Sequence, residues 1–156
     1  MKQTRKLFLT TLLACIALNA ADNSLGTWKY NLDKSKYDPG PSTVKSLTVT
    51  REASDGGVKV TRTGEGQDGT AINNSYTAKY DGKDTPVTGA TGGPYDSIAV
   101  KHLNANTNTA TLKKDGKLYA NSRTIISNGG KTMTLTLTGT DAAGKKFHNV
   151  VVYDKQ

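Results

Sequence analysis

Alternation of apolar and polar residues is the feature that most limits the folds open to this chain. Between 132 and 138 every second residue is a threonine, and Met133, Leu135 and Leu137 fill the positions between them. The segment 57–63 alternates in a similar way. Because the side chains of a strand point alternately to its two faces, this period predicts strands with one buried and one solvated face, as in antiparallel sheets.

Short turn sequences separate these alternating runs. Pairs such as Asp55-Gly56, Asp81-Gly82 and Asp115-Gly116 supply the positive φ angles that tight hairpin turns need. Since the connections are short, each strand is expected to pair with the next one in a meander. Nine or ten strands are expected, near 26–31, 43–52, 57–65, 71–81, 84–88, 97–104, 108–114, 117–127, 131–140 and 146–154.

A flat sheet of so many strands would leave two unpaired edges, and closing the sheet into a barrel removes both. The sequence therefore predicts an all-β fold, an antiparallel up-and-down meander of 8–10 strands closed into a barrel. The segment from Asn31 to Ser42 is expected to be irregular, because it contains Pro39, Gly40 and Pro41. We interpret it as a linker between the first two strands rather than as a lid over the barrel mouth.

The first twenty residues have the pattern of an export signal. Lys2, Arg5 and Lys6 precede an apolar run of about a dozen residues, as in signal peptides. A membrane-spanning helix would need about 20 apolar residues. We expect residues 1–20 to be a signal peptide and residues 21–156 to be a single β-barrel domain, exported to the periplasm or secreted.

Cys15 opens an alternative to a cleaved leader. Leu12-Leu13-Ala14-Cys15 resembles a lipoprotein box, whose cysteine receives a lipid anchor, so the domain would then be a membrane-tethered lipoprotein. The apolar residues 16–18 weaken this reading, because a polar tether usually follows the cysteine. Cys15 is the only cysteine, so the domain holds no disulfide. No later apolar run is long enough for a transmembrane segment.

The start of the first expected strand, Gly26-Thr27-Trp28, resembles the Gly-x-Trp motif of lipocalins and the Gly-Thr-Trp motif of fatty-acid-binding proteins. The strand count, the domain length and the late Tyr153 are also similar to the fatty-acid-binding type. The opening from 26 to 40 is similar to small exported lipocalin-like bacterial proteins of the calycin type, which have no assigned function. The resemblance implies a barrel with Gly26 and Trp28 at its closed end.

Two departures from the fatty-acid-binding pattern matter for function. Those proteins have a pair of helices after the first strand, where this chain has its Pro/Gly segment. They also carry an inward arginine two residues before the late tyrosine, where this chain has Val151. Their carboxylate-binding site therefore does not carry over, and Trp28 is expected to pack at the closed end rather than to contact a ligand.

Motifs that would indicate catalysis or a cofactor fail in their context. The glycines from Gly64 to Gly69 match a dinucleotide-binding loop, but a strand follows them instead of a helix. The two histidines, His102 and His148, lack the spacing of a metal site, and no nucleophile has a partner base. We expect no catalytic residues, no metal and no cofactor. The basic residues are scattered rather than interleaved with aromatics, which disfavours nucleic acid as a partner.

The remaining candidate site is a cavity inside the barrel. An inward arginine or tyrosine in an apolar cavity would orient the polar end of a ligand. The residues expected to do so are Arg62, Tyr76, Tyr80, Arg123 and Tyr153. In the opposing interpretation, Arg62 reaches solvent and the tyrosines fill the core with their hydroxyls outward.

These observations lead to three hypotheses of function. The first is an exported lipocalin-like binding protein, not an enzyme, for a small apolar or amphipathic ligand. The alternative is a structural or protein-interaction module of the cell envelope without a ligand cavity. The third is a hydrolase, which would need His102 or His148 beside an acid in a cleft. The sequence leaves the oligomeric state open.

Overall fold

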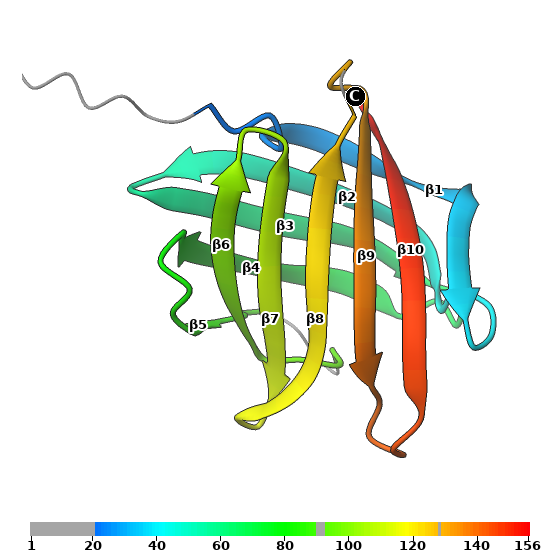
Figure 1. Ribbon diagram of the computed structural model, residues 1–156. Helices are drawn as coiled ribbons and strands as arrows, with labels where there is room; N and C mark the ends of the chain where they lie inside the picture. Colours follow the sequence, from blue (N-terminus) through cyan, green and yellow to red (C-terminus); the bar gives the residue numbers. More distant parts are fainter. Residues whose placement is uncertain (1–20, 90–92, 128) are drawn as a thin grey trace, which may run out of the picture.

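The computed structural model describes residues 21–89, 93–127 and 129–156. Within these ranges the chain forms ten β-strands and no helix (Figure 1). The proposed leader and Cys15 lie outside the described residues. No helix that could span a membrane occurs in the described part of the chain. The strands are β1 (Gly26–Asp38), β2 (Val44–Ser54), β3 (Gly57–Gly66), β4 (Ala71–Lys79), β5 (Thr85–Pro86), β6 (Ser97–Asn104), β7 (Thr107–Lys114), β8 (Lys117–Ile126), β9 (Thr132–Thr140) and β10 (Lys146–Lys155).

All ten strands belong to one antiparallel sheet, in the order β4-β3-β2-β1-β10-β9-β8-β7-β6-β5. Each strand pairs with the next along the chain, except that β4 and β5 are the two ends of the sheet order. The first strand, β1, pairs with the last, β10, and we call this contact the seam. Strands β2–β4 form one wall and β6–β10 cross it as a second wall (Figure 1). The predicted all-β meander is confirmed, and it forms a nearly closed barrel.

The barrel is completed between β4 and β6 by a few contacts rather than by a full ladder. The backbone groups of Ser75 and Thr88 exchange two hydrogen bonds, with N–O distances of 2.9 and 2.8 Å, and Gly82 N donates to Val100 O at 3.0 Å. The connecting segment 82–89 therefore spans the gap between the two walls.

Strand β1 is longer than the sequence predicts. It continues to Asp38 and pairs again with β10 at Lys36, so the expectation of an irregular segment from Asn31 onward is wrong. A bulge explains the difference, because Leu32 to Ser35 stand against the single residue Val151. The extra residues interrupt the period of two and hide the strand from pattern analysis.

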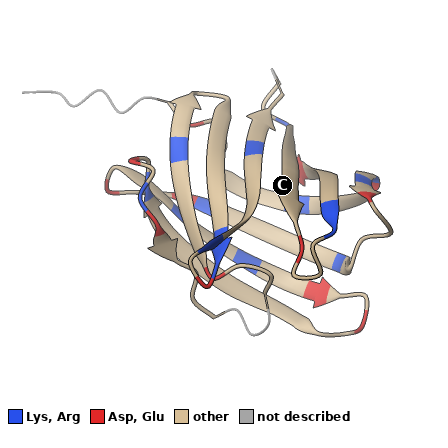
Figure 2. Ribbon diagram, turned by 60° about the horizontal axis from the view of Figure 1, so that its bottom comes forward, with Lys and Arg blue, Asp and Glu red and all other residues tan. Residues whose placement is uncertain are grey.

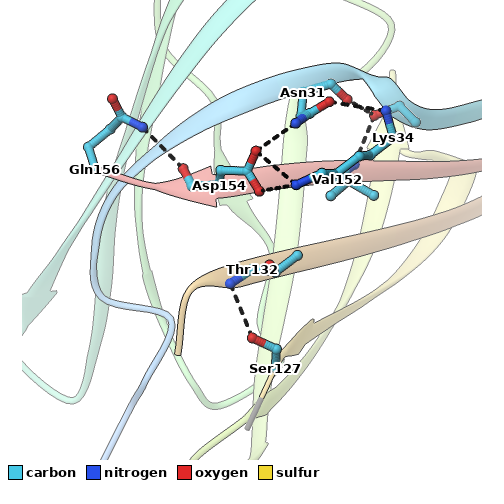
Figure 3. A network of polar contacts seen from close by, with 8 residues as sticks. Asn31, Lys34, Ser127, Thr132, Val152, Asp154 and Gln156 are labelled. Atoms are coloured by element: carbon cyan, nitrogen blue, oxygen red, sulfur yellow. Dashed lines mark hydrogen bonds and ion pairs between the residues drawn. The ribbon is translucent and has the colours of Figure 1, made fainter. Parts of the chain in front are cut away.

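Polar side chains hold the bulge in place. Ser35 Oγ donates to Asn31 O at 2.6 Å and accepts from Val152 N at 2.9 Å. Asn31 Nδ2 donates to Asp154 Oδ2 at 2.6 Å, and Lys34 Nζ lies 3.0 Å from Asp154 Oδ1 (Figure 3). These contacts, that of Asn31 first, hold the pKa of the Asp154 carboxyl below its ordinary value. The bulge is thus an ordered part of the seam.

The end of the barrel covered by residues 22–25, which we call the base, is built around Trp28. The Trp28 side chain is fully buried, and its Nε1 donates to Ser24 O at 2.8 Å. On the neighbouring strand, Lys155 Nζ lies 5.1 Å from the centroid of the ring, within the range of a cation–π contact. Val58 and Val60 are also buried in the same cluster.

Replacing Trp28 should destabilise the protein strongly. Trp28→Ala removes a completely buried aromatic side chain and its hydrogen bond, so we expect a loss of about 3–5 kcal/mol in the free energy of unfolding. Leu118→Ala is the matched control, since Leu118 is 59% exposed, and it should stay within about 0.5 kcal/mol of wild type. Urea unfolding measures both, and equal losses would contradict the assigned role of Trp28.

Candidate ligand cavity

The interior of the barrel contains a cavity of about 620 Å³, a volume within the usual range of small-molecule sites. One side is the β2–β4 wall and the other is formed by β6–β10. We call the end of the barrel opposite the base the mouth. There the cavity is lined by residues 41–43, 66–68 and 93–94. Its apolar lining includes Leu47, Val49, Val60, Ile72, Ile98, Val100, Leu112, Met133, Leu135, Leu137 and Val151.

Arg62 is the central polar residue of the β2–β4 wall. In the sheet it stands between Val49 of β2 and Asn74 of β4, and its Nη1 donates to the Tyr95 hydroxyl at 2.6 Å. Tyr95 precedes β6 and stacks on Tyr119, with 6.4 Å between ring centroids. The interaction with Tyr95 raises the pKa of the guanidinium further, so Arg62 carries its charge at any physiological pH.

Two tyrosines add hydroxyl groups to the cavity lining. Tyr76 follows Asn74 on the inner face of β4, and Tyr153 comes from β10. Burial raises the pKa of Tyr153 to about 12 and also raises that of Tyr76. Both phenols therefore keep their protons at neutral pH and can donate hydrogen bonds.

The mouth carries a third group of hydroxyls. Tyr30 OH donates to Ser42 Oγ at 2.9 Å, and Ser42 Oγ in turn donates to Val44 O at 3.1 Å. Since the Tyr30 proton is used in this way, Tyr37 OH is the donor in its 2.9 Å contact with Tyr30 OH. Burial raises the pKa of Tyr37, so its hydroxyl keeps the proton that it donates to Tyr30.

Three of the five residues expected to contact a ligand lie together in the cavity lining, namely Arg62, Tyr76 and Tyr153. The other two do not line it. Arg123 is exposed on the outer face of β8, where its cross-strand neighbours are Thr109 and Thr136. The prediction for Arg123 was wrong because the inner face of β8 carries Ala120, Ser122 and Thr124. Two of these residues are polar, so the sequence does not identify that face as the internal one.

Tyr80 lies at the base, within a set of polar side chains that we call the base network: Asp22, Ser24, Arg51, Tyr80 and Asn108. Ser24 is fully buried at its centre. Its Oγ donates to Asp22 Oδ1 at 2.6 Å and accepts from Arg51 Nε at 3.0 Å and Asn108 Nδ2 at 3.1 Å. The Tyr80 hydroxyl donates to the other oxygen of Asp22. The network thus fastens the N-terminal segment to β2, to β7 and to Tyr80 directly after β4.

Arg51 and Asn108 belong both to the base network and to the cavity lining. Arg51 is only 8% exposed, and the sequence analysis missed it. A signal was present, because Leu47, Val49 and Arg51 alternate on β2 as Val58, Val60 and Arg62 do on β3. Asn108, Tyr95 and Asn74 were also missed, and nothing in their local sequence distinguishes them from other polar residues in turns and strands.

The two histidines lie away from the cavity. His102 Nδ1 contacts Asn108 Oδ1 at 2.8 Å, and its ring lies 5.0 Å from that of Tyr80. His148 is exposed and contacts Thr138 at 3.0 Å. Neither histidine contacts an acid in these hydrogen bonds. Among the described residues, no three His, Cys, Asp or Glu side chains gather as a metal site would require.

Comparison with known protein families finds no match for this chain, and comparison with curated protein sequences finds none either. Among solved structures, a zebrafish ileal bile-acid-binding protein in complex with cholic acid is similar, with a TM-score of 0.51 and 14% sequence identity. The alignment covers 86% of this chain and 100% of that chain. This likeness shows a shared fold, in agreement with the antiparallel up-and-down barrel that the sequence predicts.

The base network predicts a dependence of stability on pH. The pKa of Asp22 lies below its ordinary value of 3.8. Burial alone would raise this pKa, but the hydrogen bonds from Ser24 and Tyr80 and the charge of Arg51 together have a larger, opposite effect. The ionised carboxylate therefore stabilises the fold above that pH, and the contribution is lost as the pH falls through the lowered pKa.

We expect Asp22→Asn to lower the free energy of unfolding at pH 7 by roughly 1–2 kcal/mol. The difference from wild type should shrink as the pH falls below about 4. Asp55→Asn is the control, because the Asp55 side chain is fully exposed, and it should leave the unfolding midpoint unchanged. Urea unfolding at a series of pH values makes the comparison, and a difference that grows in acid would disprove the assignment.

Proposed function

We propose that this protein is a non-catalytic binding protein that holds one small apolar or amphipathic molecule inside its barrel. The cavity carries the proposal, because it has the size of a small-molecule site and combines apolar walls with a few polar groups that can orient a ligand. The fold shared with a bile-acid-binding protein supports it. The alternative, a structural or interaction module, calls for a barrel filled by its own side chains, and the cavity argues against that.

We also propose that the protein is exported and that residues 1–20 are its leader. The basic residues followed by a short apolar run support this. Cleavage after Ala20 or Ala21 would leave Asp22 and Ser24 in place, so the base network would survive processing. Attachment of a lipid at Cys15 is the alternative, and it would tether the domain to a membrane.

Native mass spectrometry of the protein purified from the envelope of the cell that produces it tests both proposals. A co-purifying molecule of defined mass would support a binding function, and its dissociation under collision would identify a non-covalent ligand. The mass of the protein itself distinguishes a chain cleaved after Ala20 or Ala21 from one that begins at a lipidated Cys15. A chain that retains residues 1–20 in the envelope would contradict the export proposal.

A large side chain placed in the cavity should weaken binding without unfolding the protein. Ala110 lines the cavity on β7, whereas the next residue, Thr111, hydrogen-bonds to Asn121 on the outer face. Ala110→Trp is expected to weaken binding of the uncharged fluorescent probe N-phenyl-1-naphthylamine by about tenfold or more. Thr111→Trp should bind as wild type does. Fluorescence titration decides the matter, and equal affinities for the two variants would rule out an internal site.

A further inference from the structure

The cavity wall made by β2–β4 carries two positive charges side by side. Arg51 stands opposite Val60 and Arg62 stands opposite Val49 in the antiparallel register, so the two arginines are diagonal neighbours on the same inner face. Diagonal positions of this kind lie within reach of long side chains. Both arginines line the cavity.

The charge of Arg62 has little to neutralise it. Within the described ranges the ion pairs involve lysines on the surface, and none involves Arg51 or Arg62. Asp22 lies near Arg51 at the base, and the two charges attract each other, whereas no ion pair involves Arg62 in the described part of the chain. The carboxylate in the cavity lining is Asp68 at the mouth, which accepts from Thr70 N at 3.0 Å.

Elsewhere on the molecule, basic and acidic residues are scattered over strands and turns (Figure 2). The pair Arg51 and Arg62 is different, because it faces an apolar interior. A charge removed from water without a partner is unfavourable, and a bound anion would relieve it. The polar lining therefore matches a ligand of negative charge and disfavours a cationic one.

A buried polar atom marks the same place. Asn74 is the cross-strand neighbour of Arg62, and its Oδ1 is buried with no hydrogen-bond partner among the described residues. The Arg62 guanidinium has further N–H groups besides the one given to Tyr95. A ligand with acidic oxygens for Arg62 and a neighbouring hydroxyl or N–H for Asn74 would satisfy both residues.

The position of the arginines along the wall determines how deep in the cavity the charged end of the ligand would lie. Leu47, Gly64 and Ile72 lie on the mouth side of the arginines, and Val58 and Ala78 lie on the other side. The facing wall supplies apolar side chains, among them Leu135, Leu137 and Val151. An anion bound here would thus lie inside the cavity, surrounded by apolar surface, rather than at the solvent-exposed mouth.

We propose that the cavity selects a monoanionic amphipath and holds its carboxylate, sulfate or sulfonate group against Arg62, with Arg51 as the second positive charge. This inference rests on the proposed binding function and adds the charge and orientation of the ligand. The site uses β2 and β3. It is therefore separate from the position of Val151 on β10, where fatty-acid-binding proteins carry their arginine.

The first test compares ligands that share one chain and differ in the head group. Dodecanoate, dodecyl sulfate, dodecanol and dodecyltrimethylammonium would compete with N-phenyl-1-naphthylamine for the purified protein. The anions are expected to bind about tenfold more tightly than the alcohol, which corresponds to about 1.4 kcal/mol, and the cation more weakly than the alcohol. The preferred anion of the two distinguishes a carboxylate from a sulfate ligand.

The second test uses matched arginine variants. Arg62→Met should remove most of the preference for the anion over dodecanol, with Arg51 supplying what remains, and it should change the affinity for dodecanol much less. Arg123→Met, the same substitution on the outer face of β8, should leave both affinities unchanged. Arg62→Lys keeps the charge but not the planar fork, so an intermediate loss is expected. These variants are compared after circular dichroism shows native β structure.

The outcomes separate this inference from the proposed function. Equal affinities of the wild-type protein for dodecanoate, dodecyl sulfate and dodecanol would overturn the anion site and keep the binding function. Failure of all four ligands and of the neutral probe would overturn both. Should Arg62→Met not fold, ¹³C NMR of carboxyl-labelled dodecanoate on the wild-type protein decides. The bound carboxyl is expected to stay ionised at a pH where the free ligand takes up a proton.

Discussion

The pairing of β1 with β10 is the interaction on which the rest of the structure depends. Without this seam the chain would form two separate meanders, one from β1 to β4 and one from β5 to β10, each with a half-exposed apolar face. Joining the first and last strands turns these two faces toward each other and makes a single interior. Trp28, paired with Lys155 at one end of the seam, and the bulge ordered by Asn31 and Ser35 further along both serve this contact.

The two walls that the seam joins are chemically unequal. The β2–β4 wall carries both arginines of the cavity lining, Arg51 and Arg62, whereas β9 and β10 contribute mainly Leu135, Leu137 and Val151. This division follows from the period of two, because each inner position belongs to one strand and one wall. An interior with its positive charges on one side can orient a molecule, while a uniformly apolar interior could only enclose it.

Much of this arrangement was predictable, and the exceptions have physical causes. Alternation identified β3 and β9 and put Arg62 on the face of Val58 and Val60, although it left open whether the side chain reaches solvent. The same rule applied to β2 would have found Arg51. It failed for β1 because four bulged residues shift the period, and for Arg123 because Ser122 and Thr124 on the inner face of β8 are no more apolar than the outer residues. The size of the cavity was beyond pattern analysis, since it depends on how far apart the seam holds the two walls.

The base network connects the interior to the beginning of the described chain. Ser24 accepts a hydrogen bond from Arg51 and from Asn108, and both of these residues also line the cavity. The orientation of Arg51 therefore depends on the N-terminal segment and not only on β2. A barrel with a large cavity gives up packing contacts in its interior, so the closed base must contribute rigidity that the centre does not have. Trp28 and the fully hydrogen-bonded hydroxyl of Ser24 supply this rigidity at the base, where Ser24 holds Arg51. The side chain of Arg51 therefore stays in the apolar cavity instead of turning toward solvent.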